Sequence, residues 1–157
     1  MRLVFLAFVV AIVACGTAPT KPVAPKATKI LVDVDDKGVI LGGNDAVAYA
    51  KDNAATPGNE SITSSFGGAT YQFASAENKA AFDAGPSKSA PQFGGYCAFA
   101  ASQNRLSVAD PSVFLIRDGQ LLVFTNEDYK TQFLADPAGN KAKADANWPG
   151  LIERYGK

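Results

Sequence analysis

The sequence predicts a small α+β domain of β-hairpins and short helices, behind an N-terminal export signal and a flexible tether. Two pairs of short runs with strand-like composition, each joined by a turn that contains glycine, predict the hairpins. Short segments that begin with a polar capping residue and an acidic first turn predict the helices. Residues 1–14 contain one basic residue and an apolar run too short for a permanent bilayer span, which is typical of a secretory signal.

Cys15 ends the sequence Ile-Val-Ala-Cys of residues 12–15, which is similar to a bacterial lipobox. By this similarity Cys15 is lipidated, with palmitate among the expected acyl chains, and becomes the first residue of the mature chain. An ordinary signal peptide cut nearby is the alternative. Gly16 stands where an aspartate retains enterobacterial lipoproteins in the inner membrane. We therefore expect a lipid anchor in the outer membrane, facing the periplasm of the bacterial envelope.

Residues 15–29 are rich in Thr, Ala, Pro and Lys and show no apolar periodicity, so they are predicted to be a tether. Residues 30–157 have the length and the apolar content of one domain. The chain has 15 basic and 15 acidic residues, and this balance gives no electrostatic reason to expect nucleic acid as a partner.

The chain contains no histidine, which excludes Ser-His and Cys-His nucleophile pairs as well as zinc or haem sites built on imidazole. The acidic residues are scattered, and no pair of them is placed in one pocket by the sequence. We therefore expect no catalytic residues, no enzymatic activity and no cofactor.

The first elements are predicted from short local patterns. Residues 30–34 are predicted to form a strand, followed by a turn. Asp33, Asp35 and Asp36 lack the spacing of a calcium loop, so we expect them in a solvated turn. Asp45 is predicted to cap a helix or turn over residues 46–49.

Residues 61–66 and 69–73 are predicted to form the first hairpin, and Ser75 is predicted to cap a helix that runs to residue 84. Residues 97–101, in the aromatic and glycine-rich stretch 90–103, are predicted to form a short helix or tight turn.

The second hairpin, residues 113–117 and 120–124, has Asp-Gly at its turn and nearly continuous apolar runs. It is therefore expected to be covered on both faces. Asn126 is predicted to cap a helix that carries Tyr129, Phe133 and Leu134 to the core. Asp136-Pro137 is predicted to end that helix, and residues 140–147 to form a further one. Trp148 is expected to fill the core behind it.

Cys97 has two open interpretations. It is a small buried hydrophobe, as free cysteine usually is, or it is a thiolate ligand or redox thiol. Nothing cationic adjoins it in the sequence to favour the thiolate. If Cys15 is lipidated, Cys97 has no partner for a disulfide within the chain.

Four segments together resemble the bacterial YHS domain family. These are residues 43–49 (GNDAVAY), 67–82 (GGATYQFASAENKAAF), 90–103 (APQFGGYCAFAASQ) and 138–151 (AGNKAKADANWPGL). The resemblance implies a small α+β fold, often in secreted proteins, and residues 30–157 are therefore expected to be a YHS-like domain. Some relatives bind metal through three cysteines. Ala48, Ala74 and Asn78 stand at those positions here, so the sulfur-ligand site is absent.

The sequence thus predicts a lipid-anchored, non-enzymatic envelope protein with a YHS-like binding module for an unidentified small ligand or envelope protein. The alternative is a weak metal-binding protein that uses Cys97 with oxygen ligands. The candidate ligand-binding residues are Cys97, Tyr96, Asp45 and Tyr49, and no dedicated metal site is expected.

Overall fold

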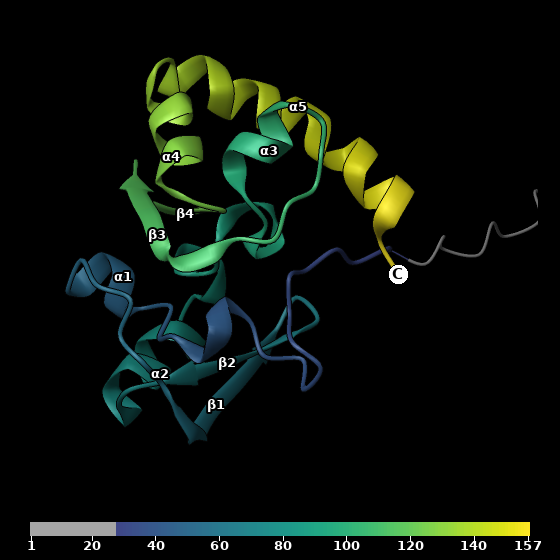
Figure 1. The fold of residues 1–157 in the computed structure, drawn as a ribbon. Coiled ribbons are helices and arrows are strands. Elements are labelled where there is room, and N and C mark those ends of the chain that lie inside the picture. The colour runs from purple at the N-terminus through teal and green to yellow at the C-terminus, as the bar shows by residue number, and fades with distance from the viewer. Residues whose placement is uncertain (1–27) are drawn as a thin grey trace, which may run out of the picture.

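The computed structural model describes residues 28–157 and confirms the α+β class. In this range two antiparallel two-stranded sheets lie among five α-helices and short 3-10 turns (Figure 1). No helix within the range has the length and apolar character needed to cross a membrane. The predicted signal, Cys15 and the tether up to residue 27 lie outside the described residues.

The first hairpin, formed by β1 (Asn59–Phe66) and β2 (Ala69–Phe73), is confirmed. Only β2 alternates between buried and half-buried residues, so β2 supplies the core face while β1 is largely exposed. Tyr71 and Phe73 pack on Phe82 of α2 (Ala76–Asp83), with ring centroids 4.5 and 5.1 Å apart. The predicted cap of α2 is also confirmed, because the Ser75 side chain accepts a hydrogen bond from the Asn78 backbone N–H.

The second hairpin, formed by β3 (Asp110–Arg117) and β4 (Gln120–Phe124), lies between two cores. Leu122 and Phe124 of β4 belong to the core beneath the later helices, and Leu121 and Val123 belong to the core of the first hairpin. Successive side chains of a strand point to opposite faces, so β4 is buried on both sides. This explains its continuous apolar run and confirms the expected coverage of the hairpin for β4. In β3 only Val113 is buried, so the prediction of full coverage does not hold for that strand.

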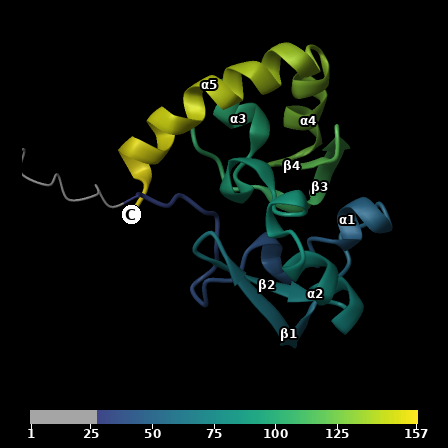
Figure 2. The ribbon, with the colours of Figure 1, turned by 180° about the vertical axis from the view of Figure 1, so that it is seen from behind.

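The cores divide the domain into two halves that Figures 1 and 2 show from opposite sides. The β1–β2 half contains η1 (Leu41–Gly43), α1 (Ala48–Lys51), the first hairpin, α2 and η2 (Pro86–Lys88). The β3–β4 half contains η3 (Gln92–Gly95), α3 (Ala98–Ser102), the second hairpin, α4 (Glu127–Leu134) and α5 (Pro137–Tyr155). The short helix predicted near Cys97 is thus confirmed as α3.

The helix after β4 begins as predicted, but one of its core assignments is wrong. The Asn126 side chain caps α4 by accepting a hydrogen bond from Tyr129 N–H, and Phe133 is fully buried. Leu134 is 44% exposed. One residue is about 100° of helix rotation, which carries Leu134 off the face that buries Phe133.

The last helix corrects the prediction of a short helix over residues 140–147. Asp136 does end α4, but its side chain then caps α5, which begins at Pro137 and continues without a break to Tyr155. Pro149 lies inside this helix. Apolar contacts on either side of it, from Trp148 and from buried Leu151, hold both flanks of the proline against the core. Trp148 itself is half-buried, with its ring 5.6 Å from that of Phe93.

Residues 30–34 do not form the predicted strand, because each position finds a different partner. Ile30 exchanges two backbone hydrogen bonds with Lys157, Asp33 N–H donates to the Gly94 carbonyl, and Val34 forms an isolated bridge with Ile40. A Cβ at residue 94, where φ is +57°, would lie 2.1 Å from the Leu31 carbonyl oxygen. Glycine is therefore required there for the N-terminal segment to cross η3.

Candidate functional site

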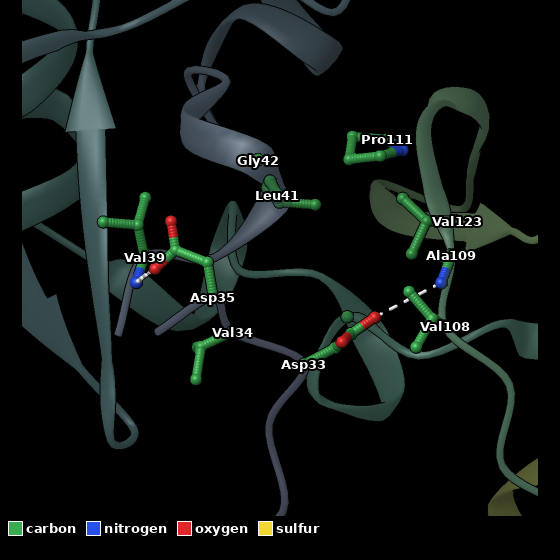
Figure 3. Close-up of a pocket in the computed structure, with 11 residues that line it drawn as sticks. Asp33, Val34, Asp35, Val39, Leu41, Gly42, Val108, Ala109, Pro111 and Val123 are labelled. Carbon is green, nitrogen blue, oxygen red and sulfur yellow. Dashed lines mark hydrogen bonds between the residues drawn. The ribbon is translucent and has the colours of Figure 1, made fainter. Parts of the chain in front are cut away.

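A cleft opens between the two halves of the domain, beside the N-terminal segment (Figure 3). Its volume is about 360 Å³, which falls at the lower end of the range of about 300–1,000 Å³ for small-molecule sites. Most of the lining residues are aliphatic, and two of them are aspartates. The lining residues are Asp33, Val34, Asp35, Val39, Leu41, Gly42, Gly95, Val108, Ala109, Pro111 and Val123.

Asp33 is held in place by two hydrogen bonds to distant backbone groups, one through its own N–H and one through its carboxylate. Its N–H donates to the Gly94 carbonyl at 2.8 Å, and its Oδ2 accepts from Ala109 N–H at 3.2 Å. Figure 3 shows the carboxylate directed toward Ala109 at the cleft wall. Burial raises the pKa of the Asp33 carboxyl above its ordinary value of 3.8, although the Ala109 hydrogen bond acts in the opposite direction. Within residues 28–157, no Lys or Arg forms an ion pair with Asp33.

Asp35 also lines the cleft, but its Oδ1 organises the following turn. That oxygen accepts hydrogen bonds from Lys37 N–H at 2.9 Å and Val39 N–H at 2.8 Å. Asp35 and Asp36 are exposed, as expected for a solvated turn. Asp33 is half-buried, so the prediction that it belongs to this turn is wrong. The physical reason is its distant partner Ala109, which draws the side chain into the cleft.

The Asp45 carboxylate is fully buried and satisfied by the protein itself. Oδ1 accepts from Val47 N–H at 2.9 Å and from Ala48 N–H at 3.4 Å. Oδ2 accepts from Ala74 N–H at 2.9 Å and from Asn78 Nδ2 at 2.7 Å. Four donors occupy the approximately four lone-pair directions of a carboxylate, so no acceptor capacity is left for a ligand. The predicted capping role of Asp45 is confirmed.

The Asp45 network also brings together the three positions at which the family resemblance implies metal-binding cysteines. Residues 48, 74 and 78 each donate to this one carboxylate, the first two through the backbone and the third through its side chain. They present no sulfur and no imidazole. Within residues 28–157, no group of three His, Cys, Asp or Glu side chains is arranged to hold a metal ion.

Tyr49 links α1 to the second hairpin and has no exposed surface. Its hydroxyl donates to the Pro111 carbonyl at 2.9 Å, and its ring meets Phe114 edge-on at 4.8 Å. Burial and the negative charge of Asp110 raise the pKa of the Tyr49 phenol. These contacts give Tyr49 a structural role.

Cys97 is a free, fully buried residue that precedes α3 and belongs to the core of the β3–β4 half. The interpretation of this residue as buried is thus confirmed. Its neighbour Tyr96 is half-buried, and its hydroxyl points to the Val32 carbonyl at 3.4 Å. Burial and the nearby Asp33 charge raise the pKa of the Tyr96 phenol.

The four sequence-predicted ligand residues therefore do not form one site. Asp45 and Tyr49 belong to the β1–β2 half, and Cys97 and Tyr96 belong to the β3–β4 half. Sequence reasoning missed Asp33 as a site residue. One signal was present, since Asp33 is the single charged residue between the apolar residues 30–32 and Val34.

A second cleft, of about 460 Å³, lies where the N-terminal segment meets the end of α5. Tyr96 lines it together with exposed Tyr155 and with Lys157. No carboxylate side chain lines this second cleft. The first cleft is the better ligand site because it combines aliphatic walls with a fixed, half-buried charge.

Compared with protein-family models, curated proteins and solved structures, the chain gives no match. The relation to the YHS domain family therefore rests on the four sequence segments.

Proposed function

We propose that this chain is a lipid-anchored, non-enzymatic binding protein of the bacterial envelope, held by Cys15 to the outer membrane and facing the periplasm. Its YHS-like domain binds a small ligand in the cleft beside Asp33. The observation that carries the proposal is the cleft itself, a concave site with aliphatic walls and one half-buried charge. The missing histidine supports a binding role over catalysis, since the imidazole base of Ser-His and Cys-His pairs is lacking.

The Asp45 network supports the YHS-like part of the proposal. Three positions that the resemblance assigns to one metal site converge on a single carboxylate, although they are up to 30 residues apart in sequence. Replacing Ala48, Ala74 and Asn78 together by cysteine is expected to create a site that binds one zinc ion per chain. Circular dichroism would check the fold and metal analysis the stoichiometry. A folded triple variant without zinc would argue against the resemblance.

The anchor is tested by Cys15→Ser. The variant is expected to leave the membrane fraction or to accumulate unprocessed, because no thiol is available for the acyl group. Unchanged membrane fractionation and unchanged mass would contradict lipidation of Cys15.

The binding cleft is tested by screening a mixed library of neutral, cationic and anionic fragments against the full chain in detergent. Binders are expected to shift the backbone amide resonances of Gly42, Gly95 and Ala109, which line the cleft. Ala109→Leu adds bulk at the cleft wall and should remove these shifts. Ala142→Leu adds the same bulk at an exposed position of α5 and should leave them. A library without any binder at the cleft would contradict the proposal.

The weak metal site is the second candidate, and it has less support. Cys97 is enclosed by apolar residues, and the Asp45 oxygens are occupied by protein donors. Titrating zinc or copper(I) into the Cys15→Ser chain is expected to show no sub-micromolar, stoichiometric binding. Such binding, if lost in a Cys97→Ser variant of the same chain, would favour the metal function instead.

A further inference from the structure

We propose that the ligand of this cleft is a small organic cation, whose ammonium group pairs with Asp33 and whose apolar body lies against Val34, Leu41 and Val123. This inference rests on the proposed binding function and specifies its ligand class. It follows from one charge, the walls around that charge and the volume they enclose.

The charge is fixed before any ligand arrives. Asp33 is held through its backbone by Gly94 and through Oδ2 by Ala109, so its side chain loses little conformational freedom on binding. Every side-chain nitrogen or oxygen that is fully enclosed in the described part of the chain has a hydrogen-bond partner. Asp33 Oδ1 accepts no hydrogen bond within residues 28–157, so it cannot be one of these enclosed atoms and is in contact with solvent.

The cleft itself presents no countercharge to Asp33. Its lining contains two aspartates and no Lys or Arg, and Asp33 forms no ion pair within residues 28–157. A half-buried carboxylate without an ion pair is stabilised by a bound cation that also excludes water. An anionic ligand would meet two negative charges among the lining residues, Asp33 and Asp35, so charge complementarity favours a cation.

The walls favour an organic cation over a metal ion. The side chains of Leu41, Val123 and Pro111 have no donor atoms for a metal, and Asp35 Oδ1 is engaged with two backbone N–H groups. An ammonium group needs only one carboxylate, and aliphatic walls bind the hydrocarbon that carries it. The rim is apolar as well, since Val108 lines the cleft and is 66% exposed.

Benzylammonium and benzyl alcohol form a matched pair of probes that differ mainly in charge. Each is titrated into the full chain in detergent, and binding is followed through the amide resonances of Gly42, Gly95 and Ala109. We expect benzylammonium to bind with a dissociation constant at least tenfold lower than that of the alcohol. In Asp33→Asn the amide oxygen can still accept from Ala109, so the fold is retained while the preference disappears. Asp36→Asn removes the same charge from the exposed turn and should keep the preference.

The possible outcomes separate this inference from the function on which it rests. Equal binding of alcohol and amine at the cleft would overturn the cation and keep the binding site. A preference that survives Asp33→Asn would also overturn it. If neither probe binds while other fragments shift the cleft amides, the cation inference fails and the proposed function stands. If no fragment binds at the cleft, both fail.

Discussion

Asn78 donates a 2.7 Å hydrogen bond from Nδ2 to Oδ2 of Asp45, and both side chains are buried. The Oδ1 atom of Asn78 accepts in turn from Lys51 Nζ at 3.1 Å. A buried carboxylate is thereby connected to a half-exposed ammonium group through one amide, which joins the end of α1 to the start of α2.

Asn78→Ala is expected to lower the free energy of unfolding by about 1.5–3 kcal/mol, because it removes a hydrogen bond to a buried charge. Urea unfolding measures the change. Glu77→Ala is the neighbouring control, since it removes only the exposed ion pair with Lys51 and should cost less than about 1 kcal/mol. Similar costs for the two variants would show that the Asp45 contact contributes little.

Gly119→Val is expected to cost about 1 kcal/mol or more. Asp118 and Gly119 have φ of +51° and +74°, so the Asp-Gly turn of the second hairpin requires left-handed backbone at both positions. A Cβ at residue 119 would meet no atom of another part of the chain within 4 Å, so the cost comes from the local backbone conformation. Gly119→Asn should cost less, because asparagine tolerates this region. Equal unfolding midpoints for both variants and the unchanged chain would contradict this account.

Cys97 is expected to react slowly with a thiol reagent in the native Cys15→Ser chain and rapidly after denaturation. The side chain has no exposed surface, so the reagent reaches the sulfur only when the domain opens. Cys97→Ser should cost about 1–3 kcal/mol by placing a hydroxyl in the core, whereas Cys97→Ala should cost less than a large core truncation. Rapid native labelling at neutral pH would reject the inert, buried thiol.

The stability of the domain is expected to fall slightly as pH rises through the titration of Asp33. Burial raises the folded pKa above 3.8, so the folded state holds this proton more tightly than the unfolded state. The stabilisation that the folded state gains from binding this proton is complete below pH 3.8 and is lost as pH rises through the raised pKa. The phenol of Tyr96 faces the same carboxylate, and its pKa lies above 10, outside this window.

Asp33→Asn should remove that part of the pH dependence, so the variant gains stability relative to the parent chain as pH rises above 3.8. Urea unfolding at a series of pH values measures it, with Asp36→Asn as the matched control. If the free energies of unfolding of the variant and the parent chain differ by the same amount at every pH, the raised pKa is contradicted.

Features set by neighbouring residues were predictable from the sequence. The Asp118-Gly119 turn and the caps at Ser75 and Asn126 depend on residues within a few positions, and all three are confirmed. Burial of both faces of β4 was readable from its unbroken apolar run.

Features set by distant partners were not predictable in this way. Pro149 is a local helix breaker, but contacts of Trp148 and Leu151 with the core keep α5 continuous. Asp33 is held at the cleft by Gly94 and Ala109, which lie 61 and 76 positions away in the sequence. No local pattern encodes that pairing.

The N-terminal segment has a consequence for the order in which the parts of the domain fold. Lys29 hydrogen-bonds to the backbone of Glu153, 124 positions later, and Ile30 pairs with Lys157. These contacts join segments more than 120 positions apart, so they depend on a very long loop being closed. Closing such a long loop is slow compared with forming either hairpin. Asp33 belongs to this segment and forms one wall of the cleft, so we expect the binding site to be completed only after both hairpins have folded.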